Sequence, residues 1–128
     1  MQIESKKNRL PVSLIAAIIM AESSFDPNAI SSANALGLMQ VTRDTGDMYK
    51  ASDLLIPEEN IRVGAKHLSW LYYKVFSQDL TLALSAYNAG IGNVRKYENK
   101  IPPFNETREY IKKVKHYYTQ YYALDRSK

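Results

Sequence analysis

The residue that most needs a chemical explanation is Glu22, a carboxylic acid on an apolar helix face. Ile15, Ile18 and Ile19 precede it by seven, four and three positions, a spacing that brings side chains together on one side of a helix. Loss of hydration there disfavours the charged carboxylate, so we expect the pKa of Glu22 to be raised. A carboxylic acid that keeps its proton near neutral pH is what general-acid cleavage of a glycosidic bond requires.

Taken alone, Glu22 is more simply explained as an exposed residue in the last turn of a helix, because most glutamates are exposed. Three further segments carry groups that could act together with an acid: residues 37–40, 87–90 and 106–110. Each also has a purely structural explanation, as a turn glycine, a helix-ending glycine and a charged first helical turn. The interpretation of Glu22 therefore depends on finding all of them in one chain.

The elements expected to position these groups are helices. Pro11 stands in the first turn of a helix that continues from Val12 to about Ser24. This helix is apolar on nearly every side, so it is predicted to be central. A second helix begins at Pro57. Its predicted buried face repeats at spacings of four and three residues: Ile61, Ala65, Leu68, Tyr72 and Val75.

The second half of the sequence is predicted to be helical as well. Asp79 is placed to cap a helix from Leu80 to Ala89, and Gly90 fits its left-handed C-terminal position. A short turn or helix follows near residues 93–97, and Asn105 is expected to cap the last helix. One stripe of that helix contains Tyr110, Val114, Tyr117 and Tyr121. Because no segment alternates with a period of two, the predicted fold class is all-α, with roughly six helices.

Length and composition limit the chemistry that the chain can perform. Its 128 residues, 45% of them apolar, are enough for one domain spanning residues 1–128. The sequence contains no cysteine, and its two histidines, His67 and His116, lie far apart. We therefore expect no metal site, no cofactor and no Ser-His-Asp relay, which leaves carboxylates and tyrosines as the reactive groups.

The formal charge of +4 favours anionic partners such as nucleic acid, acidic lipids or bacterial wall polymers, although a slightly basic surface alone explains it as well. Lys112, Lys113 and Lys115 form no run long enough for a nucleic-acid arm, so nucleic acid is not an expected partner. No stretch reaches the roughly 18 apolar residues that a membrane span needs, and the N-terminus lacks the layout of a signal peptide. A monomer without stable membrane insertion is the default expectation.

Together these segments resemble the lytic transglycosylase family, which has a goose-type-lysozyme-like fold. The matching pieces run in the family's order: Glu22-Ser23, Gly37-Leu38-Met39-Gln40, Asn60 with Gly64 and Leu68, Ala86-Tyr87-Asn88-Ala89-Gly90, and Glu106-Thr107-Arg108 with Tyr110-Ile111 and Val114. The chain departs from the family's pattern at Asn34, where many relatives carry glycine. It also carries Val41-Thr42-Arg43 where many have Met-Pro.

The resemblance implies a substrate groove and a role for each matching residue. Glu22 would be the single catalytic acid and base, and Met39 would pack beneath it. The implied substrate-binding residues are Ser31, Met39, Gln40, Tyr87, Asn88, Ala89 through its backbone carbonyl, and Tyr110. No metal, nucleotide or other cofactor is implied.

The resemblance also implies a reaction on peptidoglycan glycan strands. Glu22 would cleave the β-1,4 bond between N-acetylmuramic acid and N-acetylglucosamine without water, leaving a 1,6-anhydromuramyl end. Such a substrate places the protein in the bacterial cell envelope, either the periplasm or the extracellular wall.

Other functions remain possible at this point. A hydrolytic muramidase on the same fold would need a second carboxylate, for which Asp44 and Asp47 are the candidates. A non-catalytic glycan-binding module would keep the groove without turnover. A basic nucleic-acid-binding helical domain is the last alternative, and it leaves the five matching segments unexplained.

Overall fold

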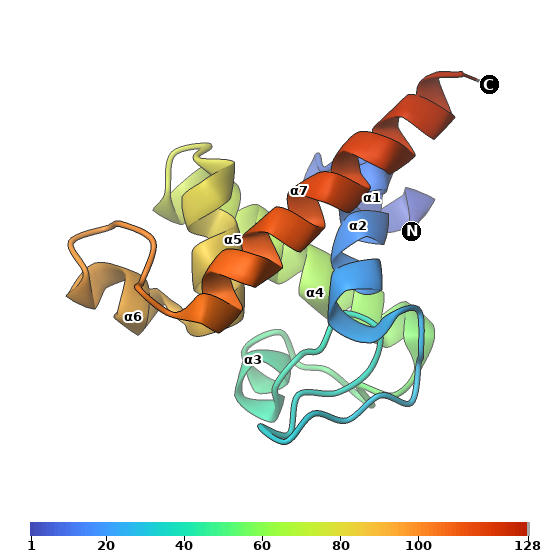
Figure 1. Ribbon diagram of the computed structural model, residues 1–128. Coiled ribbons are helices and arrows are strands. Elements are labelled where there is room, and N and C mark those ends of the chain that lie inside the picture. Colours follow the sequence, from blue (N-terminus) through green and yellow to red (C-terminus); the bar gives the residue numbers. More distant parts are fainter. Residues whose placement is uncertain (128) are drawn as a thin grey trace.

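The computed structural model describes residues 1–127, which form an all-α domain and confirm the predicted fold class (Figure 1). Within this range there are seven α-helices and one π-helical segment, η1, where about six helices were expected. Their bounds are α1 (Gln2–Asn8), α2 (Val12–Ser23), α3 (Arg43–Met48), α4 (Pro57–Trp70), η1 (Leu71–Val75), α5 (Leu80–Ala89), α6 (Ile91–Lys96) and α7 (Asn105–Arg126).

The centre of the domain is α2, as its apolar sequence predicted. Leu14, Ile15, Ile18 and Ile19 are at most 3% exposed and lie in the core. The long helix α7 crosses the front of the molecule and packs along α2 and α5 (Figure 1). Through this packing, the C-terminal end of α2 comes to lie beside the first turns of α7.

The second predicted helix begins at Pro57, as expected, but its buried face differs in part from the prediction. Ala65 and Leu68 are buried, whereas the predicted residues Ile61, Tyr72 and Val75 lie half-buried at the edge of the core. Val63 and Leu71, outside the predicted stripe, are fully buried. After Trp70 the helix widens into η1, where the Phe76 N–H donates to the Leu71 carbonyl five residues earlier, and this wider turn shifts the side-chain register.

The ends of the other predicted helices agree with the structure to within two residues. The Leu82 N–H donates to Asp79 Oδ1 at 3.0 Å, which confirms the predicted cap of α5. Gly90 has a positive φ of 92°, but its ψ of 147° is extended rather than left-handed helical, so α6 begins directly after it. Asn105 does not cap α7, because the helix already includes it and Phe104 holds the capping position. Likewise Pro11 precedes α2 rather than standing in its first turn.

Two short helices were not predicted from the sequence. None of the residues of α1 is buried, so no apolar periodicity marks it. The six residues of α3 are too few to show a period, although Thr42 caps the helix by accepting a hydrogen bond from the Thr45 N–H. No helix within residues 1–127 is long and apolar enough to cross a membrane.

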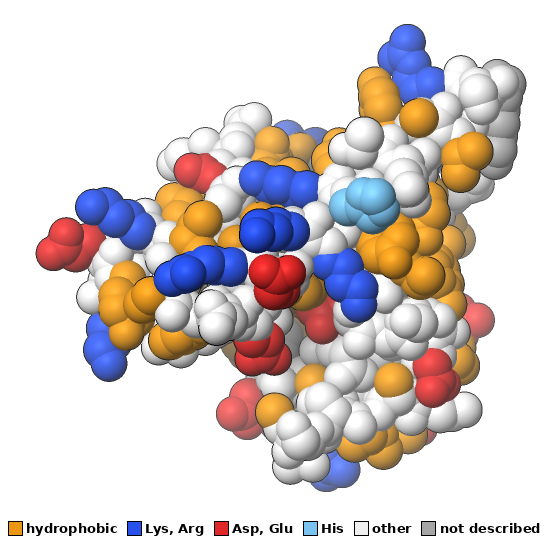
Figure 2. Space-filling model, viewed as in Figure 1, with side chains coloured by type: hydrophobic (Ala, Val, Ile, Leu, Met, Phe, Trp, Pro, Cys, Tyr) orange, Lys and Arg blue, Asp and Glu red, His pale blue; other side chains and the backbone are white. Residues whose placement is uncertain are grey.

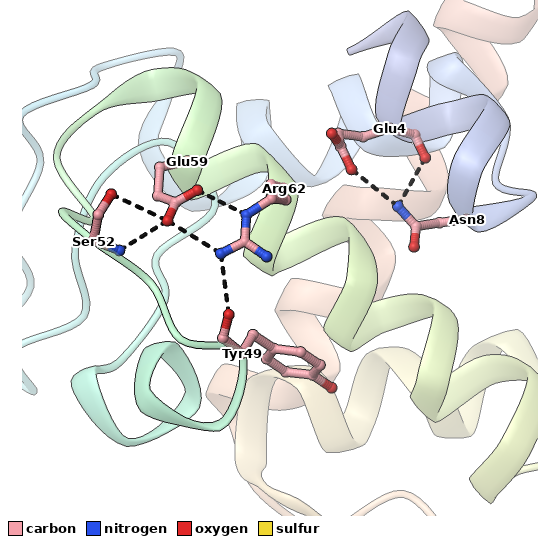
Figure 3. A network of polar contacts seen from close by, with 6 residues as sticks. All are labelled: Glu4, Asn8, Tyr49, Ser52, Glu59 and Arg62. Carbon is pink, nitrogen blue, oxygen red and sulfur yellow. Dashed lines mark hydrogen bonds and ion pairs between the residues drawn. The ribbon is translucent and has the colours of Figure 1, made fainter.

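A polar network attaches the segment after α3 to the start of α4 (Figure 3). Arg62 forms an ion pair with Glu59 at 2.7 Å and also donates to the Tyr49 carbonyl at 3.0 Å. The Glu59 carboxylate in turn accepts from the Ser52 N–H at 2.8 Å, and the hydrogen bonds from Arg62 and Ser52 lower its pKa to about 2. The network fixes the position of α3 and of the chain that follows it.

Candidate active site

Glu22 lies in the last turn of α2, half-buried, on the wall of a cavity of about 560 Å³. Burial raises the pKa of its carboxyl group to about 8 from an ordinary value of 4.5, as the sequence predicted. The negative charge of Glu106 adds to this rise, while the hydroxyl of Tyr110 and the charge of Lys113 oppose it. The carboxyl group is therefore mostly protonated at neutral pH.

The Tyr110 side chain reaches the same cavity from α7 and is only 7% exposed. Its hydroxyl faces the Glu22 carboxyl group closely enough to affect the pKa of both groups. The contact nevertheless falls short of a hydrogen bond: within residues 1–127, Tyr110 Oη is the one buried side-chain nitrogen or oxygen without a partner. A buried hydroxyl in this state is free to donate to a carboxylate or to a ligand.

The loop of residues 37–40 reaches the cavity because its backbone packs closely against α4. Gly37 has a φ of 77°, and a Cβ atom there would clash with Asn60 Nδ2, so this close approach of the loop to α4 requires a glycine. Asn60 is fully buried and accepts a 2.7 Å hydrogen bond from the Met39 N–H. Its Nδ2 donates to the carbonyls of Leu36 and Leu54 at 2.7 and 2.8 Å.

The same loop is also attached to the helix that carries the acid. The Ser23 hydroxyl, next to Glu22, donates to the Leu38 carbonyl at 2.8 Å. Met39 itself is fully buried, and its side chain occupies the space that Gly64 leaves open on α4. The structure therefore does not place Met39 among the ligand-accessible residues, contrary to the prediction, because its side chain is used in packing the loop against α4.

Gln40 and Asn88 both line the Glu22 cavity, where Gln40 offers a free hydrogen-bond acceptor and Asn88 a free donor. Gln40 Nε2 donates to the carbonyls of Ala29 and Gly37 at 3.1 and 2.9 Å, so its Oε1 acceptor remains for a ligand. Asn88 Oδ1 accepts from the Thr107 hydroxyl at 2.9 Å, so its Nδ2 donor remains. Thr107 is 1% exposed; it belongs to the predicted segment 106–110, although the sequence assigned it no role of its own.

The remaining predicted site residues divide between two locations. Ser31 lines the Glu22 cavity, and its hydroxyl oxygen accepts from the N–H groups of Ala33 and Ala35. Tyr87 and Ala89 line a neighbouring cavity instead. The Tyr87 hydroxyl donates to the Met39 carbonyl at 2.8 Å, and the Ala89 carbonyl accepts from Asn93 Nδ2, so both groups also stabilise the local structure.

Sequence reasoning missed most of the α7 residues that face Glu22. One side of this helix supplies the opposite wall of the cavity, with Glu106, Glu109, Lys112, Lys113, His116 and Tyr117 beside Tyr110. In Figure 2 basic side chains on α7 lie above a hollow whose rim carries acidic ones. The sequence marked Tyr110 and Tyr117 as part of a helical stripe, but the charged residues beside them at spacings of three and four gave no apolar signal of their own.

Asp44 and Asp47, the predicted candidates for a second carboxylate, do not lie on the Glu22 cavity. Both are exposed on α3, and Asp47 lines a separate depression beside Leu54. The other carboxylates that line the Glu22 cavity are instead those of Glu106 and Glu109. Within residues 1–127, no group of three or more histidine, aspartate or glutamate side chains is arranged to hold a metal ion.

A second cavity, of about 420 Å³, adjoins the first. Gln40 and Asn88 line both cavities. Asn34 lies in the loop between α2 and α3. Its φ of 61° is a left-handed conformation that glycine and asparagine tolerate best. Asparagine therefore suits this position as well as the glycine that the resemblance leads one to expect there.

Comparisons with known proteins agree with this geometry. The family model described as "Transglycosylase SLT domain" matches residues 1–111. The chain is 33% identical over 96 residues to the membrane-bound lytic murein transglycosylase F of Haemophilus influenzae, covering 71% of this chain and 20% of that protein. Its identity to the protein of the same name from Pseudoalteromonas translucida is 42% over 86 residues, covering 63% and 18%. The chain thus spans about a fifth of the length of these curated relatives.

Solved structures of similar proteins have the same fold. The 70 kDa soluble lytic transglycosylase of Escherichia coli superposes with a TM-score of 0.82 at 30% identity, over 96% of this chain and 24% of that one. An inactive glutamate-to-glutamine mutant of the lytic transglycosylase Slt of Pseudomonas aeruginosa gives 0.81 at 33% identity, over 94% and 23%. These similarities confirm the lysozyme-like helical fold that the motifs implied.

Proposed function

The chain belongs to the transglycosylase SLT domain family, and on this premise we propose that it is a peptidoglycan lytic transglycosylase domain with Glu22 as its single catalytic residue. The proposed substrate is the β-1,4 bond between N-acetylmuramic acid and N-acetylglucosamine in glycan strands. Residues 1–128 would form one catalytic domain, and the chain matches about a fifth of the length of its curated relatives.

The observation that carries this proposal is the position of the Glu22 carboxyl group, half-buried at the end of α2 on the wall of an open cavity. With a pKa of about 8, it holds its proton at neutral pH and is available as a general acid. Glu22 would donate this proton to the glycosidic oxygen as the C1–O bond breaks. The carboxylate that results would accept the proton of the muramyl 6-hydroxyl as that oxygen bonds to C1, which closes the 1,6-anhydro ring and consumes no water.

The groups around Glu22 fit the two stages of this reaction. The unpaired Tyr110 hydroxyl would donate to the Glu22 carboxylate once it has lost its proton. The Oε1 acceptor of Gln40 and the Nδ2 donor of Asn88 would bind a hydroxyl and an acetamido carbonyl of the sugars. Ser31 would contribute a further hydroxyl from the same wall.

The proposed substrate also sets the location and the partner. Peptidoglycan lies outside the cytoplasm, so we propose that the domain acts in the bacterial cell envelope, on glycan strands. The names of the relatives as membrane-bound or soluble lytic transglycosylases support this proposal.

A hydrolytic muramidase is the second candidate function, and Glu106 is the observation that favours it. Glu106 lines the same cavity and is close enough to affect the pKa of Glu22, so it offers a second carboxylate that could activate water. The two functions differ in their products, because hydrolysis adds one water to each cleaved bond.

A digest of purified peptidoglycan, read by mass spectrometry, tests the proposal. Muropeptides lighter than their reducing-end counterparts by one water are expected, both from the wild-type chain and from Glu106→Gln. Reducing ends whose release depends on Glu106 would establish the hydrolase instead. Release of no muropeptide would contradict both enzymatic functions and leave a glycan-binding module.

A further inference from the structure

We infer that Thr107 is a positioning residue, whose buried hydroxyl orients the side-chain amide of Asn88 so that its Nδ2 donor is presented to the glycan strand. This inference rests on the proposed function and deepens it, since it names the group that prepares one of the proposed sugar contacts. Thr107 is 1% exposed and lines neither cavity, so it acts through Asn88 and not on the ligand itself.

Thr107 and Asn88 come from two helices that meet at the site. Asn88 is the last residue but one of α5 and is half-buried, and Thr107 is the third residue of α7. The start of α7 packs beside the end of α5 (Figure 1), and across this contact the Thr107 hydroxyl donates to Asn88 Oδ1 at 2.9 Å. Tyr110, three residues after Thr107 on the same helix, lines the Glu22 cavity.

The Thr107 hydroxyl bonds between helices, which is not the usual arrangement for a helical threonine. Inside a helix, serine and threonine hydroxyls commonly donate to a carbonyl of the preceding turn. Thr119 does so farther along α7, where its hydroxyl donates to the Lys115 carbonyl four residues earlier. Thr107 lies in the first turn, and in the described part of the chain the acceptor of its hydroxyl is Asn88 Oδ1.

This hydrogen bond determines which end of the Asn88 amide faces the ligand. A half-turn about the terminal torsion would exchange the Oδ1 acceptor with the Nδ2 donor. The buried Thr107 hydroxyl would then face an N–H group and lose its acceptor, which is unfavourable for a buried donor. Among the described residues, the one buried side-chain nitrogen or oxygen without a partner is Tyr110 Oη, so the unbonded Asn88 Nδ2 is accessible from the cavities that Asn88 lines.

A fixed Nδ2 donor selects acceptor groups of the substrate. In the proposed complex it would donate to the carbonyl oxygen of an acetamido group, and orienting it in advance reduces the entropy lost on binding. Gln40 needs no such helper, because its own Nε2 donates to two backbone carbonyls. The orientation of the Asn88 amide depends instead on the single hydrogen bond from Thr107.

Two substitutions separate the hydroxyl of Thr107 from its shape. In the non-cleaving Glu22→Gln background, binding of peptide-free glycan strands is measured by calorimetry. Thr107→Val keeps the shape and is expected to weaken binding about tenfold, whereas Thr107→Ser keeps the hydroxyl and should recover most of this loss. A packing role would reverse the order, because serine leaves a void that valine fills. Thr107→Ala against Thr107→Ser repeats the comparison without the branched side chain.

Thr119→Val is the matched control, because it makes the same replacement at an exposed position on α7 outside both cavities. It should leave strand affinity within about twofold of the parent. A double-mutant cycle then ties the effect to Asn88. Asn88→Ala alone is expected to weaken binding, and adding Thr107→Val to it should change the affinity by less than about twofold.

The orientation of the amide can also be measured without a ligand. Relaxation of the Asn88 side-chain ¹⁵N signal, assigned by its absence from Asn88→Ala, reports the mobility of the amide. This mobility should rise in Thr107→Val and stay at the parent value in Thr107→Ser.

The outcomes separate this inference from the proposed function. Unchanged mobility of the Asn88 amide in Thr107→Val, or additive losses of affinity from Thr107→Val and Asn88→Ala, would overturn the positioning role even if the wild-type chain releases anhydro products. The expected changes in a chain that releases no such product would support the positioning role and contradict the proposed reaction. Strands that bind neither the parent nor any variant would contradict both.

Discussion

Two buried polar side chains in this domain, Asn60 and Tyr110, differ in whether their hydrogen-bonding groups have partners. Asn60, fully buried under the loop of residues 37–40, accepts one hydrogen bond and donates two, all between 2.7 and 2.8 Å. At the Glu22 cavity, the Tyr110 hydroxyl has no partner within residues 1–127, and the pKa of Glu22 is raised to about 8. Both regions lie beside the same loop, which Asn60 holds from one side and Ser23 from the other.

This difference in hydrogen bonding distinguishes the structural region around Asn60 from the candidate reaction site around Glu22. A satisfied buried amide stabilises one backbone course, and its loss would leave several groups unpaired. A carboxyl group that is kept from water and only weakly compensated by hydrogen bonds costs stability but retains a transferable proton. Substitutions at Asn60 should accordingly change mainly the free energy of unfolding, and substitutions at Glu22 mainly the rate of cleavage.

The largest expected effect is on turnover at Glu22. Glu22→Gln should lower the rate of peptidoglycan cleavage by about 10³-fold, because the amide has no proton of suitable acidity to give. Muropeptide release measures the rate, and circular dichroism checks that the fold is kept. Glu98→Gln is the control, because it makes the same replacement at an exposed position outside both cavities. A Glu22→Gln chain that still turns over would remove the basis of the reaction site.

The second effect is on stability at Asn60. Asn60→Ala should lower the free energy of unfolding by about 3 kcal/mol, because the Met39 N–H and the carbonyls of Leu36 and Leu54 lose their buried partner. Denaturant unfolding measures it. Asn105→Ala, an exposed asparagine whose side chain caps nothing, should cost less than about 0.5 kcal/mol. Equal effects at the two asparagines would show that the loop does not depend on Asn60.

A third effect links Glu22 to pH. Its folded pKa of about 8 lies above the ordinary 4.5, so between these values the unfolded chain has lost a proton that the folded chain still binds. Stability therefore falls as the pH rises from 4.5 to 8, relative to a chain without this group. Below pH 4.5, the free energy of unfolding of Glu22→Gln should change with pH in the same way as that of the wild type. It should gain roughly 2 kcal/mol over the wild type by pH 8, less than the full shift implies because water in the cavity screens the charge.

Parallel curves for the two chains, measured by denaturant unfolding across this range, would contradict the raised pKa. The same shift sets the activity profile. Turnover should be retained below pH 8 and decline above it as Glu22 loses its proton.

The smallest effects distinguish two tyrosines of the site. Tyr110→Phe removes an unpaired hydroxyl, so stability should stay within about 0.5 kcal/mol of the wild type while turnover falls roughly tenfold. Tyr87→Phe removes a hydroxyl that donates to the Met39 carbonyl, so it should cost about 1 kcal/mol of stability. Thermal unfolding and muropeptide release measure the two quantities. A larger loss of stability for Tyr110→Phe would show that its hydroxyl is paired.

The parts of the fold that could be predicted from the sequence are those that depend on local pattern. The apolar helix α2 and the Asp79 cap of α5 follow from spacing and residue type, and both were predicted. Helix α1 buries no side chain and left no pattern to find. The register change at η1 follows from packing in three dimensions, so the half-burial of Tyr72 could not be anticipated.

The site was predicted where an unusual residue stood in an apolar pattern, as at Glu22. It was missed where the arrangement joins distant segments. The bonds of Asn60 cross 21 and 24 residues to Met39 and Leu36, and no local spacing reveals them. The burial of Met39 depends likewise on the missing side chain of Gly64. The charged wall of α7 could have been found by following a three-four spacing from Glu106.

The most direct test of the account is the pKa of Glu22 itself. The side-chain carboxyl carbons of the glutamates can be labelled with ¹³C and titrated by NMR, with the Glu22 signal assigned by its absence from Glu22→Gln. One glutamate, Glu22, is expected to titrate near pH 8, well above the ordinary pKa of 4.5. A Glu22 signal that titrates near 4.5 would mean an ionised carboxylate at neutral pH, and the single-acid mechanism would fail.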